Sequence, residues 1–205
     1  MSDLKAYEVT EPMNGHGVIV FATNGATARR KGSAELDTAF EEVKSCRRAP
    51  QFDQYAPGPV PALVLIDNGW WFECQECGRR VTSELSEEVE DQGLNPADFQ
   101  PIDHDGYVFC SSACQDKHKT DKLKKAQARA ELERIFLDKF PGATVASVHV
   151  PGTELELSEP SSRYRCSVDF TFPGSKHGHC KWVYGEEVCL VPNRDLGAFQ
   201  DWRNG

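Results

Sequence analysis

Apolar and polar positions alternate most regularly near the C-terminal end of the chain. Tyr164, Cys166, Val168, Phe170 and Phe172 are separated by single polar residues. This period of two predicts a β-strand with one buried face. Further strand-like apolar runs cover 7–10, 18–21, 145–150, 180–184 and 188–191. Turn-forming residues at 11–17 separate the first two runs, so we expect these to pair as a hairpin.

A helical pattern dominates the middle of the chain. Residues 112–140 contain neither Gly nor Pro and are rich in Ala, Leu, Lys, Glu, Arg and Gln, which predicts one long helix ending at Pro141-Gly142. An interrupted apolar stripe follows it, formed by Leu123, Ala126, Ala130, Ile135, Phe136 and Phe140. We therefore expect an α+β fold in which a C-terminal antiparallel sheet packs its apolar face on this helix.

Shorter helices are expected at both ends of the chain. Residues 24–30 predict one that Gly32 stops, and residues 194–202 predict another that Asn193 caps. Leu36, Ala39, Phe40 and Val43 recur at helical spacing, although residues 40–49 are also compatible with an extended strand.

Three modules are predicted along the chain. Residues 56–61 read Ala-Pro-Gly-Pro-Val-Pro and predict a stiff linker. This linker closes a small N-terminal αβ module over residues 1–61. A cysteine-containing module is expected over 62–118, and the long helix with the antiparallel sheet over 119–205.

The strongest chemical signal is a set of four cysteines in two close pairs. Cys74 and Cys77 follow a short aromatic strand and precede Gly78, while Cys110 ends the strand Tyr107-Val108-Phe109. Cys114 falls in the first turn of the long helix. Two thiolate pairs at these spacings are typical of one closed, structural, four-coordinate Zn²⁺ site. His104 and His118 are close in sequence, but four thiolates leave neither of them needed.

Composition indicates a protein of a reducing compartment. The chain has 205 residues, eight cysteines, 39% hydrophobic and 27% charged residues, and a polar start without the apolar core of a secretion signal. No apolar run approaches the ~20 residues of a membrane span. We therefore expect a cytoplasmic protein without membrane contact. Cys46, Cys166, Cys180 and Cys189, which lie outside the zinc set, are expected to pack as small apolar side chains.

Charge is distributed unevenly around the cysteine pairs. The net charge of -9 argues against general coating of nucleic acid. Residues 81–106 contain eight carboxylates and no Lys or Arg, whereas five lysines lie between 117 and 125. Both segments are candidate partner-binding surfaces as well as ordinary solvated surface. The residues concerned are Glu84, Glu87, Glu88, Glu90 and Asp91 in the acidic segment and Lys122, Lys124 and Lys125 in the basic one.

Catalytic motifs are scarce in the sequence. Neither a phosphate-binding Gly-rich loop nor a Gly-x-Ser-x-Gly motif occurs. The sharpest enzymatic candidate is His177, His179 and Cys180, as a Cys-His pair or as a second metal site with Cys166 and Cys189. A polar turn leading into a strand explains these residues more simply, so we predict a protein that is not an enzyme.

The sequence motifs Cys74-Gln-Glu-Cys77-Gly78 and Phe109-Cys110-Ser111-x-x-Cys114 resemble those of treble-clef zinc fingers of the FCS/TRASH-like kind. Together with the N-terminal segments 7–22 and 47–53, these motifs are similar to sequences found in a set of phage and prophage accessory proteins. The resemblance covers roughly residues 6–118 and transfers no active-site residue. It implies expression in an infected bacterial cell and a small role that is either regulatory or directed at the host.

Two functional hypotheses follow from these patterns, besides the hydrolase. The first is a zinc-containing phage protein that binds and inhibits a host protein or protein–nucleic-acid complex, in the manner of an anti-CRISPR protein, with the acidic segment imitating a nucleic-acid backbone. The second is a nucleic-acid-binding accessory protein that uses the zinc module and the lysines at 117–125.

Overall fold

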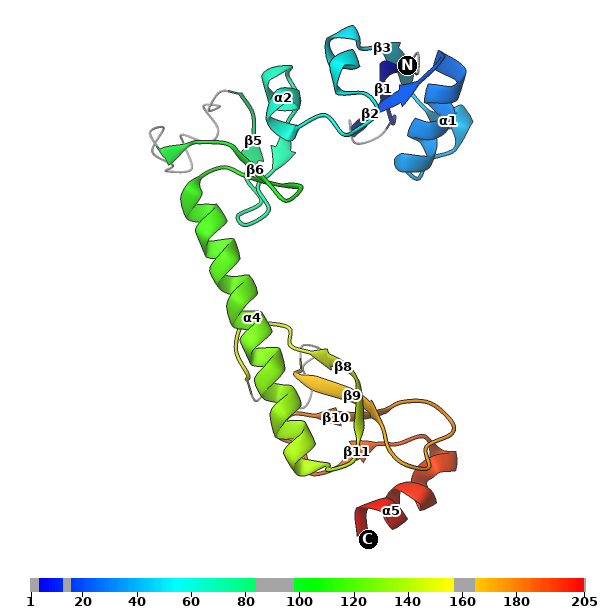
Figure 1. Ribbon diagram of the computed structural model, residues 1–205, viewed down its shortest axis with the longest axis vertical. Helices are drawn as coiled ribbons and strands as arrows, with labels where there is room; N and C mark the ends of the chain where they lie inside the picture. The colour runs from blue at the N-terminus through cyan, green and yellow to red at the C-terminus, as the bar shows by residue number, and fades with distance from the viewer. Residues whose placement is uncertain (1–3, 13–15, 84–97, 157–164, 205) are drawn as a thin grey trace. The chain divides into compact units, whose positions relative to one another are not determined.

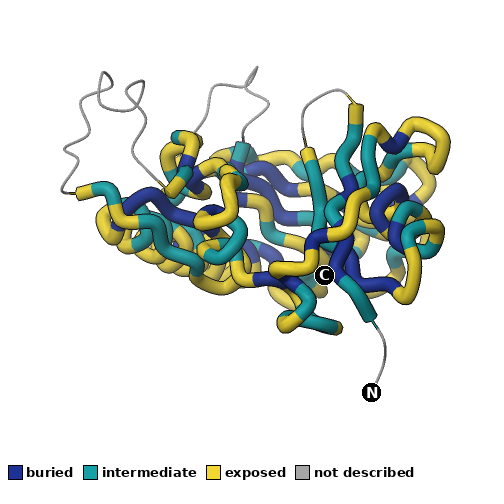
Figure 2. Tube along the Cα trace, turned by 90° about the horizontal axis from the view of Figure 1, so that it is seen from above, coloured by how far each residue is buried: buried dark blue, intermediate teal, exposed yellow. Residues whose placement is uncertain are grey.

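The computed structural model describes residues 4–12, 16–83, 98–156 and 165–204 (Figure 1). It is a mixed α+β structure with several small antiparallel sheets and one long helix. The chain forms two compact units, Met1–Ser112 and Ala113–Gly205. Buried positions, dark blue in Figure 2, fall largely on the strands and on the helix faces that pack against them.

The first unit begins with a three-stranded sheet in the order β2-β1-β3. Strands β1 (Lys5–Thr10) and β2 (Gly17–Ala22) pair antiparallel, which confirms the expected hairpin. Helix α1 (Gly25–Glu35), capped by the Asn24 side chain, packs on this sheet. The expectation that Gly32 stops this helix is wrong. A Cβ atom at Gly32 would lie 2.6 Å from the Val9 side chain, so glycine there allows the helix to approach β1 closely.

The helical spacing at 36–43 produces only a short 3₁₀ turn, η1 (Phe40–Glu42). The alternative strand forms in part, as β3 (Ser45–Arg48), which pairs with the other side of β1. A second 3₁₀ segment, η2 (Pro50–Tyr55), follows and buries Phe52.

The Pro-rich segment packs within the first unit. Val60 lies in an apolar cluster with Phe21 and Phe52, and Leu65 of helix α2 (Ala62–Asp67) packs against the same cluster. Two further contacts cross this region. The Trp70 ring would lie 3.1 Å from a Cβ atom at Gly17, and Asp103 accepts a hydrogen bond from the Ala62 backbone at 2.8 Å. Residue 61 is therefore not where the two compact units divide.

Two short hairpins carry the cysteines of the first unit. Strand β4 (Phe72–Glu73) pairs with β5 (Arg80–Val81), and β6 (Ile102–His104) pairs with β7 (Tyr107–Phe109). The backbone N–H of Gln75 donates to the Val108 carbonyl at 2.9 Å and so joins the first hairpin to the second.

The second unit is built on helix α4 (Ser112–Lys139), which confirms the predicted long helix. Its sheet has the order β11-β10-β9-β8, all neighbours antiparallel. The strands are β8 (Thr144–His149), β9 (Ser167–Thr171), β10 (Cys180–Val183) and β11 (Cys189–Leu190). A 3₁₀ turn, η4 (Asn193–Asp195), leads into α5 (Leu196–Asn204).

The apolar face of this sheet packs on α4, as the alternating pattern predicts. Phe136 lies with its ring centroid 4.8 Å from that of Phe170 and 5.8 Å from that of Trp182. Leu132, Phe136 and Phe140 supply the helix side of the core. The stripe is shorter than expected, because Leu123, Ala126 and Ala130 are exposed and the first buried residue of α4 is Ala128.

A search of the described residues for membrane-crossing helices found none with the required length and apolar character.

Candidate metal centre

The four predicted cysteines come together in one cluster. The sulfur atoms of Cys74, Cys77, Cys110 and Cys114 all lie within 4.8 Å of one another. Cys74 and Cys110 are buried, Cys114 is half-buried and Cys77 is exposed. Within the described residues this is the only group of three or more potential ligand side chains found close enough to hold a metal ion.

Each ligand is placed by a local structural element. Cys74 and Cys77 occupy the turn between β4 and β5, where the Gly78 N–H donates to the Cys74 carbonyl at 2.8 Å. Gly78 has a φ of +70°, a left-handed conformation in which a side chain would be strained. Cys110 follows β7, and Cys114 lies in the first turn of α4. The spacing of the cysteines in the sequence was therefore enough to identify these four positions as one cluster.

Backbone amides point at the sulfur of Cys74, one of the two buried cysteines of the cluster. Burial by itself raises the pKa of the Cys74 thiol, but the N–H groups of Cys77, Cys110 and Glu76 donate to this sulfur and lower its pKa to about 7. Amides directed at a sulfur stabilise the thiolate, which is the form that binds metals. The turn is therefore shaped for a negatively charged sulfur.

The spacing of the sulfurs fits a tetrahedral ion. A Zn–S bond of about 2.3 Å with tetrahedral angles separates neighbouring sulfurs by about 3.8 Å. The sulfur atoms of Cys77 and Cys110 lie 3.7 Å apart. The four residues can thus hold one metal ion, with every ligand supplied by the protein.

Cysteines outside the cluster have a different chemical setting. Burial raises the pKa of Cys46 and Cys180, and it raises the pKa of Cys189 to about 11. Cys166 and Cys180 belong to the core of the second unit, and Cys189 packs against it. These three thiols therefore behave as the small apolar side chains expected from the sequence.

The residues of the hydrolase hypothesis differ in their exposure to solvent. His177 and His179 are exposed, whereas Cys180 is buried in the core with a raised pKa. The buried Asp195 carboxylate accepts hydrogen bonds from the backbone N–H groups of Lys176 and His177, at 3.1 and 2.9 Å. Asp195 thereby fixes the turn that carries His177.

The structure describes the candidate residues of only the basic one of the two charged segments. Glu84, Glu87, Glu88, Glu90 and Asp91 lie outside the described residues. Lys122 and Lys124 are exposed and Lys125 is half-exposed, in a part of α4 with no buried residue. Sequence reasoning also missed a polar cavity on the sheet of the second unit, for which the only signal was the polar half of the β9 alternation.

Comparison of the chain with protein-family models, with curated proteins and with solved structures found no match.

Proposed function

We propose that this chain is a binding protein stabilised by a structural zinc ion, and not an enzyme. The observation that carries the proposal is the cluster of four cysteine sulfurs within 4.8 Å. Four thiolates favour Zn²⁺ over hard cations, and a complete protein ligand set leaves no open position for a substrate or an activated water. The order of a cysteine turn, a second hairpin and a helix start supports a treble-clef-like arrangement.

The metal would act on the two cysteine hairpins and on the start of α4. Cys74 and Cys77 would hold the β4–β5 turn, and Cys110 the end of β7. Cys114 would fix the start of α4 to both. When bound, the ion supplies cross-linking between segments that are distant in sequence, and the amides around Cys74 keep its sulfur in the thiolate form.

Elemental analysis and cobalt substitution test the site. Protein purified without chelator should contain close to one equivalent of zinc, and its Co²⁺ form should show the visible absorption of a tetrahedral tetrathiolate. Cys114→Ser should lose both signals, whereas Cys46→Ser, which changes a half-buried thiol outside the cluster, should keep them. Less than half an equivalent of metal in the unmodified protein would contradict the proposal.

A second candidate function is nucleic-acid binding by the N-terminal half of α4. Residues 113–130 contain six Lys or Arg and two Asp. Lys122, Lys125 and Arg129 fall on one helix face, and no described residue forms an ion pair with them. A polar helix segment with free cations is suited to phosphate contacts.

Salt dependence distinguishes this candidate. The logarithm of the affinity for duplex DNA should fall with the logarithm of salt concentration by about 0.9 per phosphate contacted. A triple variant, Lys122→Glu, Lys124→Glu and Lys125→Glu, should bind more weakly and with a shallower slope, while Lys176→Glu serves as an exposed control in the second unit. Unchanged binding by the triple variant would eliminate the candidate.

We also propose a host-directed role, supported by the net charge, the acidic segment and the resemblance of the cysteine motifs to those of phage proteins. Inhibition of a host defence complex would place the carboxylates at 84–91 in a basic cleft of the target. Replacing Glu87, Glu88 and Glu90 with Gln should then abolish binding to that target without changing zinc content. Retained binding would exclude the acidic segment as the contact surface.

A further inference from the structure

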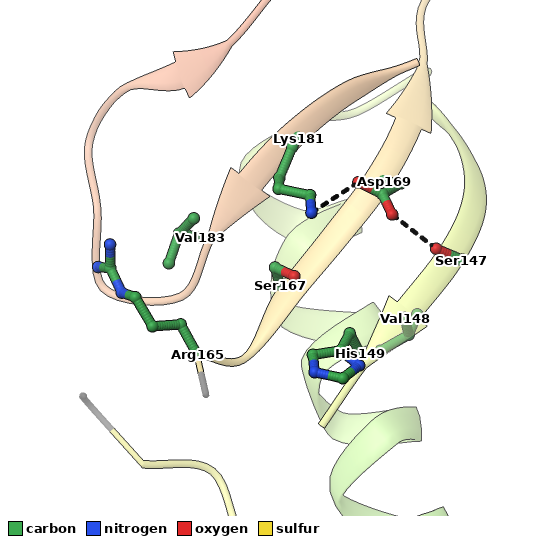
Figure 3. Close-up of a pocket in the computed structure, with 8 residues that line it drawn as sticks. All are labelled: Ser147, Val148, His149, Arg165, Ser167, Asp169, Lys181 and Val183. Atoms are coloured by element: carbon green, nitrogen blue, oxygen red, sulfur yellow. Dashed lines mark hydrogen bonds and ion pairs between the residues drawn. The ribbon is translucent and has the colours of Figure 1, made fainter. Parts of the chain in front are cut away.

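The sheet of the second unit has a polar face on the side away from α4 (Figure 3). Strand pairing sets its side chains in rows. Asp169 of β9 lies opposite Ser147 of β8 and Lys181 of β10. In the next row, Ser167 lies opposite His149 and Val183. Because directly opposed residues share a face, these side chains project together from the sheet.

A cavity of about 550 Å³ lies over these rows, and Arg165 at the approach to β9 also lines it. Small-molecule sites in proteins commonly measure about 300–1,000 Å³. The cavity is therefore large enough for an organic molecule, and not only for an ion.

The one carboxylate that lines this cavity is already paired. Asp169 accepts from the Ser147 hydroxyl at 2.9 Å, and its other oxygen lies 3.6 Å from the Lys181 ammonium, so both of its oxygens are engaged. Ser167 is only 5% exposed, and no described residue pairs with its hydroxyl. A serine hydroxyl without a partner among the described residues thus lies at the centre of the cavity.

Arg165 adds a second unsatisfied donor. One of its terminal nitrogens lies 2.7 Å from Glu186, but its buried Nε has no hydrogen-bond partner among the described residues. A buried N–H without a partner favours any ligand that brings an acceptor. Lys181 is held by a long contact and is 46% exposed, so its ammonium can turn from Asp169 to a ligand.

We propose that this cavity binds a small phosphorylated molecule, a function separate from the metal centre. The phosphate lies over Ser167, between Lys181 and His149, and the organic part lies against Val183, towards Arg165 (Figure 3). The Ser167 hydroxyl, the Lys181 ammonium and a ring N–H of His149 can each donate to a different oxygen, which suits a tetrahedral group with three free oxygens better than a planar carboxylate.

Calorimetric titration of the zinc-loaded full chain with phenyl phosphate, benzoate and phenol tests the proposal. Phenyl phosphate should bind, with an affinity that falls as salt is added, and benzoate should bind at least about tenfold more weakly. Phenol should not bind. No heat with millimolar phenyl phosphate, or equal affinity for benzoate or phenol, would overturn the assignment.

Variants locate the bound phosphate. Lys181→Met and Ser167→Ala should each weaken phenyl phosphate binding by at least about tenfold. Lys176→Met is the matched control, because this exposed lysine does not line the cavity. Amide spectra of the core residues verify that each variant is folded, and Lys181, being largely exposed, is the safer substitution. Unchanged affinity in folded Lys181→Met would place the ligand elsewhere and refute the site.

Discussion

The cysteine hairpins and the C-terminal sheet hold short strands in two different ways. Strands β4–β7 form two separate two-stranded pairs of two or three residues per strand. The C-terminal sheet has four strands and buries Phe136, Phe170 and Trp182 between itself and α4. An isolated two-stranded hairpin is at best marginally stable in water, whereas a larger sheet packed on a helix supports itself.

This difference explains where the cysteines lie. Their sulfurs cluster at the two isolated hairpins, and the remaining cysteines of the second unit are core or core-packing residues. A metal ion would supply to the hairpins the cohesion that aromatic packing supplies to the sheet. The two regions should therefore respond to different perturbations.

Removing the metal is expected to have the largest effect, and it should be confined to the hairpins. Metal binding to four-thiolate peptides contributes on the order of 10–16 kcal/mol of apparent free energy. In Cys74→Ser, amide exchange should accelerate strongly over residues 72–81 and 102–110. Amides of β9 and β10 should keep their protection, because their core contains no metal ligand. Hydrogen-exchange mass spectrometry measures both.

Cys114→Ser should behave like Cys74→Ser, since each variant leaves the ion with three ligands. Cys46→Ser is the control for loss of a thiol outside the cluster. Uniform acceleration in both units would show that the metal, and not local packing, stabilises the whole chain. An unchanged profile in both cluster variants would remove the metal from the stability of the fold.

The substitution Phe136→Ala should instead destabilise the second unit and leave the metal site unchanged. Phe136 is fully buried, with ring centroids of Phe170 and Phe140 at 4.8 and 5.0 Å. Truncating such a residue leaves a cavity and should cost about 3–5 kcal/mol of unfolding free energy in the second unit, measured by urea denaturation. Zinc content should not change. Leu137→Ala, at the next and more exposed position, should cost much less, and equal costs would argue against the packing described for α4.

Sequence patterns were sufficient where one physical signal acted alone. The period of two around Val168, the unbroken helix formers of α4 and the cysteine spacings predicted a strand, a helix and a cluster that the structure contains. Signals with two meanings were not sufficient. In the sequence, a glycine that ends a helix cannot be distinguished from one that lets a strand approach the helix closely, as Gly32 shows. The prolines at 57–61 indicated a linker, but Val60 between them is buried against Phe52.

The polar cavity could not be derived from the sequence for a related reason. Strand alternation places Ser167 and Asp169 on the outer face, but the partners opposite them depend on the register of β8 and β10. Register is set by the whole sheet and its turns, including the irregularity between Val145 and Ser147. Similarly, no local pattern showed that Trp70 would pack on Gly17.

A smaller effect is expected where α1 crosses the N-terminal sheet. In Gly32→Ala, the new methyl group would meet Val9 at 2.6 Å, and such overpacking typically costs about 1–3 kcal/mol. The gain in helix propensity, about 1 kcal/mol, offsets part of this cost. Gly25→Ala is the matched control in the same helix, because its nearest neighbour would be Tyr7 at 3.8 Å. Thermal unfolding should show a lower melting temperature for Gly32→Ala alone. A stabilised Gly32→Ala would mean that the close approach of α1 to β1 is not needed.

The smallest expected effect concerns an ion pair that joins β3 to the 3₁₀ segment after it, away from both the cysteine cluster and the C-terminal sheet. The Asp53 carboxylate accepts from Arg48 at 2.6 and 2.9 Å and from the Ala6 N–H at 2.7 Å, and the Arg48 bonds are the main reason that its pKa falls to about 2. A carboxyl whose pKa is lower in the folded state stabilises the fold above its unfolded pKa, about 4, and loses that contribution as the pH falls towards 2. The gain is modest because Asp53 is partly exposed and screened by solvent. Melting temperatures of the wild-type protein and Asp53→Asn should therefore differ above about pH 4 and converge towards pH 2. Asp67→Asn, which changes an exposed carboxylate without a described partner, should follow the wild type throughout. A constant difference between Asp53→Asn and the wild type across this range would show that the ionised pair does not contribute to stability.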